Sequence, residues 1–232
     1  MGDMSVEQIL FQISVWALPV LIAVTLHEAA HGFVAWRLGD DTAYQMGRVT
    51  FNPLRHIDPV GTVLMPAALL FFSGGRVMFG YAKPVPVDFG RLGRPRRDMV
   101  LVAAAGPGVN LLLAITAALL VHAAVLLPGW AAPWALQNLA NAIWINVLLM
   151  VFNLLPMPPL DGGRIAVGVL PLSLARPLAR MERAGMFVIL AAIFLLPWLG
   201  EQIGLDLNIF RWLVGAPSEY VVNLIASATG IR

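Results

Sequence analysis

Long apolar segments separated by short polar loops make up most of the chain. Three of them cover about 7–38, 99–127 and 134–155, and further apolar stretches lie within 184–228. About 20 such residues in a helix cross the hydrocarbon core of a bilayer, because a helix rises about 1.5 Å per residue. The pattern therefore predicts three long membrane-spanning helices followed by C-terminal helices. The last of these, over about 205–228, either spans or lies at the membrane interface.

Two stretches between the first and second helices depart from this pattern. Residues 57–73 hold an apolar core that is short for a span, so we expect a re-entrant element, with a full crossing as the alternative. Residues 76–89 alternate loosely and carry Pro84 and Pro86, which is typical of an extended strand or hairpin with an incompletely paired edge. A small β-hairpin or re-entrant element is therefore predicted over about 57–90.

The composition places the whole chain in a membrane. Hydrophobic residues make up 59% and charged residues 12%, whereas a soluble domain has about 25% charged residues. We expect an all-α polytopic membrane protein, with one integral membrane domain over 1–232. The absence of cysteine excludes disulfides and thiolate metal sites. A net charge of +2 without basic–aromatic interleaving predicts no nucleic-acid partner. Asp3 and Glu7 near the start argue against a cleaved signal peptide.

Basic residues in the loops predict the orientation of the helices. The loops 76–98 and 164–183 are rich in arginine, whereas 128–133 carries no charge. Cytoplasmic loops carry the excess of Lys and Arg, so the first two are expected in the cytoplasm and the third outside. The segment 134–155 then ends on the cytoplasmic side. If the basic loop 39–56 is also cytoplasmic, the N-terminus lies outside.

The most polar feature of the first apolar segment is the stretch VTLHEAAHGF, residues 24–33. His27 and His31 are four apart and therefore share one helical face, with Glu28 beside the first. This is the H-E-x-x-H arrangement of metalloproteases, in which two histidines bind zinc and the glutamate takes a proton from water that the metal acidifies. Ionisable residues in a spanning segment are costly, so metal binding explains the motif better than chance or packing.

A catalytic zinc usually needs a third protein ligand. Asp161 is the favoured candidate, because it ends the segment 134–155, follows a proline-rich break and precedes two glycines that permit a tight turn. An ordinary turn aspartate is the alternative. His56 lies in a polar loop and is either a ligand, a supporting group or a turn residue. His122 sits at the opposite membrane side, and Glu182 among arginines is expected to be a solvated charge.

Two asparagines lie seven apart in the third spanning segment and so share a face. Buried amides need hydrogen-bond partners. For Asn153, next to the break, we expect a position facing the cavity, where it can hold a substrate backbone or an oxyanion. For Asn146 we do not expect a position facing the cavity but a hydrogen bond between helices.

These motifs together resemble the site-2 protease family of intramembrane zinc metalloproteases. HEAAH is followed about 120 residues later by NLLPMPPLDGG, which fits the pattern N-x-x-P-x-P-x-L-D-G of that family. AGPGVN at 105–110 resembles the small-residue segment that opens the intervening helix in that family. FNPLRHIDPVGT and GYAKPVPV resemble its compact prokaryotic branch, which has no PDZ domain. The resemblance implies a core of three helices, here about 7–38, 99–127 and 134–155, with C-terminal helices over about 184–228.

The resemblance also implies roles for individual residues. Three residues match the ligands of one Zn²⁺ per chain: His27, His31 and Asp161. Glu28 matches the general base, and Asn153 matches an asparagine that contacts substrate or transition state. Weaker candidates for substrate contact are Asn110, His56 and Asn146.

The predicted function is therefore hydrolysis of peptide bonds within or near transmembrane segments of other proteins. The expected partners are a transmembrane protein substrate, locally unwound, and the lipid bilayer. The expected location is the cell membrane, with the active site nearer the cytoplasmic side. An exposed edge over 81–87 is expected to pair with extended substrate. The alternatives are a metal transporter, which would need a polar path to both faces, and a catalytically silent membrane scaffold.

Overall fold

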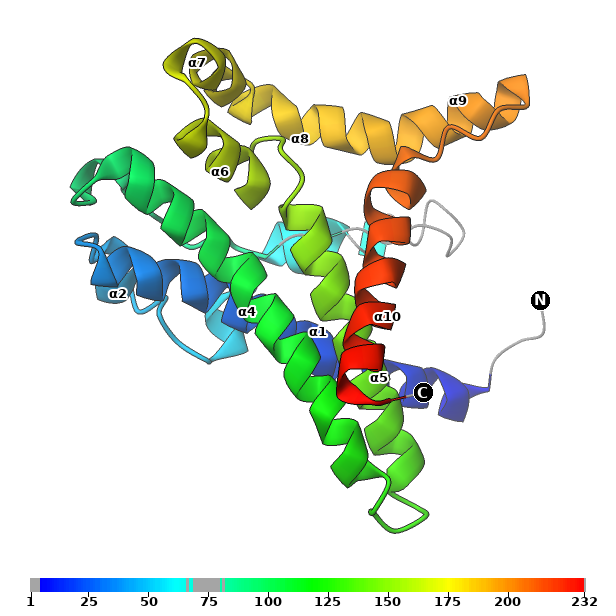
Figure 1. Ribbon diagram of the computed structural model, residues 1–232. Helices are drawn as coiled ribbons and strands as arrows, with labels where there is room; N and C mark the ends of the chain where they lie inside the picture. The colour runs from blue at the N-terminus through cyan, green and yellow to red at the C-terminus, as the bar shows by residue number, and fades with distance from the viewer. Residues whose placement is uncertain (1–4, 66, 69–79, 81, 232) are drawn as a thin grey trace.

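Three long helices form the centre of the molecule in the computed structural model, which describes residues 5–65, 67–68, 80 and 82–231 (Figure 1). They are α1 (Val6–Arg37), α4 (Pro95–Ala124) and α5 (Ala132–Asn153). Together with the stretch Ala184–Ile203, they are long and apolar enough to cross a membrane. The prediction of a helical polytopic membrane protein is confirmed in this respect.

Local sequence signals set the ends of these helices. Ser5 caps α1 through a capping box with Gln8, which satisfies backbone N–H groups that the first turn leaves without partners. Proline occupies the first turn of both α4 and α5, where its missing N–H costs no hydrogen bond. Helix α5 ends at Asn153, directly before the proline-rich break, because proline cannot continue a helix.

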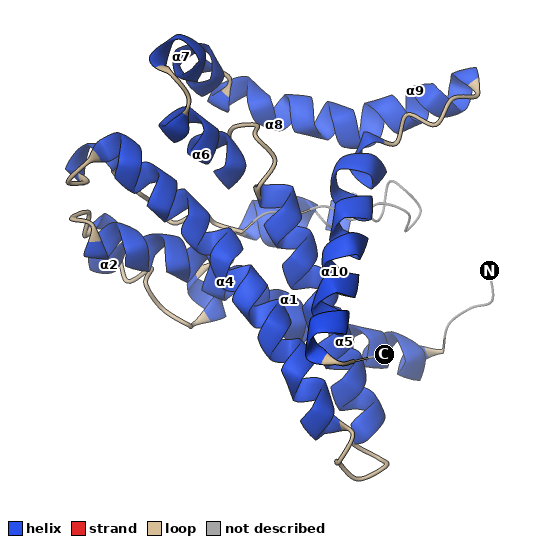
Figure 2. Cartoon of the chain, in the orientation of Figure 1, coloured by secondary structure: helices blue, strands red, loops and turns tan. Residues whose placement is uncertain are grey.

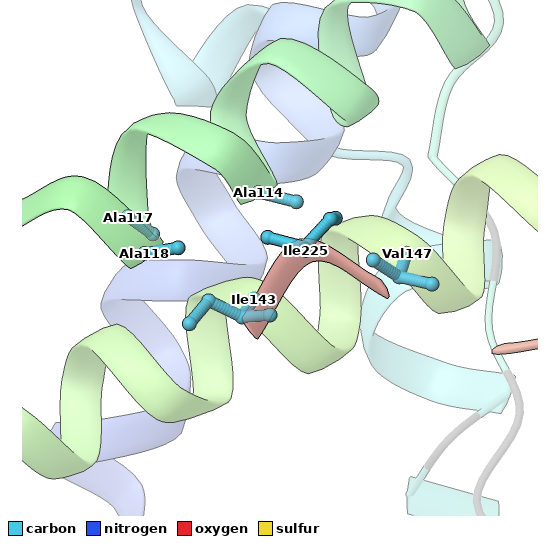
Figure 3. Close-up of a cluster of buried hydrophobic side chains, with 6 residues drawn as sticks. All are labelled: Ala114, Ala117, Ala118, Ile143, Val147 and Ile225. Carbon is cyan, nitrogen blue, oxygen red and sulfur yellow. The ribbon is translucent and has the colours of Figure 1, made fainter. Parts of the chain in front are cut away.

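Helices α1, α4 and α5 pack against one another, and α4 contacts both of the others. Its alanines face α5 and α10 (Ala216–Thr229) in a buried cluster where small side chains let the helices approach closely (Figure 3). The cluster comprises Ala114, Ala117, Ala118, Ile143, Val147 and Ile225. At the end of α4, His122 Nε2 lies 2.8 Å from the carbonyl oxygen of Thr229. His122 therefore ties α4 to the end of α10.

Shorter elements complete the described chain. After α5 come α6 (Asp161–Val169), α7 (Leu172–Arg180) and α8 (Glu182–Leu190). Helix α8 continues through η4 (Ala191–Leu195) into α9 (Leu196–Ile203), as one long stretch at the top of Figure 1. The turn η5 (Arg211–Gly215) leads into α10. Between α1 and α4, the described residues include the short helical elements α2 (Thr42–Gln45), η1 (Pro53–Arg55), η2 (Pro59–Leu64) and η3 (Phe89–Arg91).

The predicted β-hairpin is not found in the part of the chain that the structure describes (Figure 2). Residues 80 and 82–88 form no strand, and residues 69–79 and 81 lie outside the described residues. The prolines at 84 and 86 offer no N–H to a ladder. Of the predicted re-entrant stretch 57–73, residues 59–65 and 67–68 are helical, and the remainder beyond residue 68 is outside the described residues.

Candidate metal centre

Three side chains from two distant parts of the chain converge at the middle of the bundle. His27 and His31 lie one turn apart on α1, and Asp161 is the first residue of α6. The two Nε2 atoms are 3.1 Å apart, and each lies 3.3 Å from Asp161 Oδ2. All three residues are buried, and they form a group able to hold one metal ion.

The turn between α5 and α6 delivers the carboxylate. Gly162 and Gly163 pack against the backbone of the preceding break, so that any side chain there would overlap Leu154 or Pro158. Glycine at both positions therefore lets α6 begin close against the end of α5. This close approach fixes the position of Asp161, the first residue of α6.

The hydrogen bonds of the histidines decide which ring nitrogens face the centre. His31 Nδ1 lies 2.7 Å from the carbonyl oxygen of Val102, which can only accept, so this nitrogen carries the hydrogen. His31 Nε2 then presents a lone pair. His27 Nδ1 lies 2.6 Å from Asn110 Oδ1, which leaves its Nε2 facing the same point. Asp161 Oδ2 is buried without a hydrogen-bond partner among the described residues.

Three lone-pair atoms at this spacing repel one another unless a cation lies among them. Donor atoms about 2.0–2.2 Å from a tetrahedral zinc ion would lie about 3.3–3.6 Å from each other, close to the observed 3.1 and 3.3 Å. Room for such an ion depends on Gly106 of α4, because a Cβ atom there would overlap His27 and His31 Nε2. Two imidazoles and one carboxylate are the donor set of a catalytic zinc site that keeps one position open.

Glu28 is held by a segment far away in sequence, residues 82–88, which we call the strap. The backbone N–H of Val85 donates to Glu28 Oε2 at 2.8 Å. The N–H of Lys83 donates to the carbonyl of His56 at 2.9 Å. The guanidinium of Arg48 donates to the Lys83 carbonyl at 2.6 Å. The strap thus fixes one carboxylate oxygen of Glu28 beside the histidines.

The far end of the strap is tied to the loop after α1. The N–H of Asp88 donates to Asp40 Oδ2 at 2.7 Å, and Thr42 donates to Asp40 Oδ1. Burial alone would raise the pKa of the Asp40 carboxyl, but the hydrogen bonds from Thr42 and Asp88 lower that pKa below its usual value. Asp40 is therefore a carboxylate at neutral pH, and it anchors the strap.

A cavity of about 530 Å³ opens onto these groups. His27, His31, Glu28 and Asp161 line it on one side, and Asn153 lies beside them. The remaining wall is mainly apolar and includes Val24, Leu149, Phe152, Pro159 and Met186. Such a cavity can accept an extended, largely apolar peptide next to a polar reacting centre.

The other predicted site residues fall into two groups. Asn153 lines the cavity, and its Nδ2 donates to the Leu149 carbonyl at 3.0 Å. Asn110 and Asn146 are buried, do not line the cavity, and bond to each other. His56 is buried in the loop, where its Nε2 donates to the Thr50 carbonyl at 3.1 Å. These contacts give His56 a structural partner and place it outside the described metal-ligand group.

Three residues around the site had no signal in the sequence that would mark them. Arg48 acts through its guanidinium and Val85 through its backbone N–H, in hydrogen bonds between distant segments that no local pattern encodes. Arg164 lines the cavity, and its guanidinium lies 5.6 Å from the centre of the Phe89 ring and pairs with Glu182 at 3.1 Å. Glu182, predicted as a solvated charge, has a half-exposed side chain that pairs with Arg164.

The fold and the site together define a membrane-embedded metalloprotease. The model of Peptidase family M50 matches residues 15–129 and 124–196. The chain therefore belongs to this family, the site-2 protease family, and is a zinc metalloprotease. The resemblance drawn from the motifs is confirmed, and no PDZ domain is found in the chain.

Several relatives share most of the chain. It is 38% identical over 189 residues to "Putative zinc metalloprotease YwhC" of Bacillus subtilis, which covers 79% of this chain and 81% of that protein. It is 35% identical over 196 residues to "Putative zinc metalloprotease Rip2" of Mycobacterium tuberculosis, which covers 83% of this chain and 70% of that protein. No solved structure matches the chain significantly.

Replacing Arg48 with methionine tests the anchoring of the strap. The guanidinium is buried, and its loss leaves the carbonyls of Lys83 and Pro84 without their donor. We expect the free energy of unfolding to fall by about 2 kcal/mol, because hydrogen bonds from charged groups contribute about 1.5–3 kcal/mol. Unfolding of the purified protein in mixed micelles, titrated with a denaturing detergent, measures this change.

Arg91→Met is the matched control. Arg91 is half exposed and pairs with Asp41 at 2.8 Å, so its loss should cost less than about 1 kcal/mol. Equal losses in the two variants would show that Arg48 contributes no more than a surface ion pair.

Proposed function

We propose that this protein is an intramembrane zinc endopeptidase that hydrolyses peptide bonds within or near transmembrane segments of other proteins. One observation carries the proposal: two imidazole lone pairs and an unpartnered carboxylate oxygen converge beside a second carboxylate, inside apolar helices and at the wall of a cavity. Under this proposal His27, His31 and Asp161 hold one zinc ion, and Glu28 is the catalytic base.

The chain's own residues supply the proton transfers. When bound, zinc provides the Lewis acidity that polarises the scissile carbonyl and makes water more acidic. Glu28 takes one proton from the attacking water, whose oxygen forms the new bond to the carbonyl carbon. The same carboxyl then delivers that proton to the leaving amine nitrogen as the C–N bond breaks. The products are a carboxylic acid, which keeps the second proton of the water, and an amine; transfer of that proton to the amine gives a carboxylate and an ammonium group, with no further reactant.

The strap and Asn153 position the reacting groups. The N–H of Val85 occupies one oxygen of Glu28 and leaves the other for water. Asn153 lines the cavity from α5, and we assign it a contact with the substrate backbone. The earlier expectation of strand pairing along 81–87 is replaced by binding in the apolar cavity, because Val85 and Lys83 already donate their N–H groups within the chain.

The proposal places a single domain, residues 1–232, in the cell membrane with the catalytic centre nearer the cytoplasm. Arginines gather over residues 91–97, which lead into α4, and in α6 and α7, on the side where Asp161 begins α6. Short basic loops stay in the cytoplasm, which supports this orientation. The substrate is a transmembrane protein whose helix is locally unwound, since a helical peptide bond is shielded by its own hydrogen bonds.

Removal and return of the metal test the function. The protein, purified in detergent, should contain one zinc ion per chain by elemental analysis. We expect chelator treatment to abolish cleavage of a single-pass membrane substrate, and stoichiometric zinc to restore it, because three protein ligands cannot replace the Lewis acid. Magnesium added instead of zinc is the control and should restore nothing, since it favours oxygen ligands.

Two outcomes would contradict the proposal. A protein that contains zinc but cleaves no membrane substrate would favour the catalytically silent scaffold. Zinc that crosses vesicles in a protein-dependent manner would favour the transporter.

A further inference from the structure

We propose that Asn110 is a positioning residue which, together with Asn146, fixes the tautomer of His27 so that its Nε2 lone pair faces the metal centre. The inference rests on the proposed function, because it concerns the residue assigned there as a zinc ligand. It gives Asn110 and Asn146 a role toward the metal rather than toward the substrate.

The direction of each hydrogen bond is set by backbone carbonyls, which can only accept. Asn146 Nδ2 lies 2.9 Å from the Ala142 carbonyl oxygen, so the amide nitrogen must face that carbonyl. Asn146 Oδ1 therefore faces Asn110 Nδ2, 2.8 Å away. The same nitrogen of Asn110 lies 3.4 Å from the Ala23 carbonyl oxygen, which agrees with this orientation.

The directions of these hydrogen bonds determine which ring nitrogen of His27 carries the hydrogen. With its nitrogen turned toward Asn146, Asn110 presents Oδ1 to His27 Nδ1 at 2.6 Å. An amide oxygen only accepts, so His27 Nδ1 carries the hydrogen, and in the neutral ring Nε2 carries the lone pair. The opposite tautomer would set two acceptors against each other at Asn110 and point an N–H at the cation site.

Burial of the two asparagines strengthens the preference for this tautomer of His27. Asn110 and Asn146 have 0% and 2% exposed surface, so water does not compete for their hydrogen bonds. The relay joins α5, α4 and α1, and each amide uses both its donor and its acceptor along it. Groups that orient metal-binding histidines in this way typically change metal affinity by about 10–100-fold when they are replaced.

The two histidines differ in a way that allows a test. His31 Nδ1 is held by the main chain of Val102, which no substitution removes. His27 Nδ1 depends on a side chain. The matched control is Asn141, another buried amide in the same helical core, whose Nδ2 donates to the Val15 carbonyl at 2.9 Å, three turns of α1 before His27.

The experiment measures two quantities: zinc affinity, by competition with a chromophoric chelator, and the thermal midpoint of unfolding. Four proteins are compared: the wild type, Asn110→Leu, Asn110→Asp and Asn141→Leu. Leucine at either position removes a buried amide and should lower the thermal midpoint similarly. We expect only Asn110→Leu to weaken zinc binding, by about 10–100-fold. Asn110→Asp keeps an acceptor for His27 Nδ1–H, and as the protonated acid its second oxygen can still donate to Asn146 Oδ1, so this variant should bind zinc within about tenfold of the wild type.

The outcomes separate this inference from the proposed function. A wild type that takes up no zinc would overturn the proposed function itself. If the wild type binds zinc and the folded Asn110→Leu variant binds it with the same affinity, the positioning role alone is overturned. If Asn110→Leu does not fold, Asn110→Asp decides: affinity near the wild type supports the role of the acceptor, and a loss of a hundredfold or more contradicts it.

Discussion

Glu28→Gln is expected to lower peptidase activity by about 10²–10⁴-fold while zinc content stays at one ion per chain, because general acid–base groups contribute rate factors of that size. Glutamine has nearly the same shape as glutamate, and its amide oxygen can still accept the Val85 N–H that holds Glu28 Oε2. The variant therefore keeps the strap in place and removes only the ability to take a proton from water.

Cleavage of a single-pass membrane substrate and elemental analysis, measured on the same preparation, check this result. Glu219→Gln on the exposed face of α10 makes the same chemical change away from the cavity and should leave both quantities unaltered. Cleavage by Glu28→Gln at the wild-type rate would remove Glu28 from the role of base. Loss of zinc would instead show that Glu28 supports the metal site itself.

Gly106→Ala is expected to weaken zinc binding by more than about a hundredfold, and activity with it, a loss beyond the 10–100-fold typical of supporting groups. The added methyl group would overlap the two imidazole tips rather than any backbone atom. The helices need not move, because His27 and His31 can rotate away. The protein should therefore fold, and the ligand nitrogens should no longer converge.

Gly108→Ala is the control for this change, two residues along the same helix. A Cβ atom at Gly108 meets no atom within 4 Å. Alanine is also the better helix former by about 1 kcal/mol, so this variant should bind zinc normally and resist heat at least as well as the wild type. Circular dichroism confirms that both variants are helical before zinc titration. Normal zinc binding by Gly106→Ala would mean that the ion does not lie where the three donor atoms converge.

Local periodicity explains which parts of the fold the sequence could predict. Apolar runs of sufficient length become helices in a bilayer whatever their neighbours are, because the backbone must satisfy its own hydrogen bonds there. The structure places α1, α4 and α5 within a few residues of the predicted segments. The prediction of a strand over 76–89 was wrong for the described residues of that range. Their backbone groups bond to the side chains of Glu28 and Arg48 instead of a neighbouring strand.

By itself, the sequence determined that the chain is helical and membrane-embedded, and that His27, Glu28 and His31 share one region of a helix. It did so because a helix places residues four apart on one face, a relation that involves no other part of the chain. Asp161 could be named as a candidate from the prolines and glycines around it, but the residues alone did not show that it meets the histidines.

Only the tertiary structure decided which groups support that motif. The Val85 N–H on Glu28, the Asn110–Asn146 relay to His27 and the close approach of Gly106 all join residues separated by more than 35 positions. Contacts of this kind depend on how α1, α4, α5 and the strap pack in three dimensions. Many sequences satisfy the same helical periodicity, and the packing of one helix face against another selects the few atoms that touch.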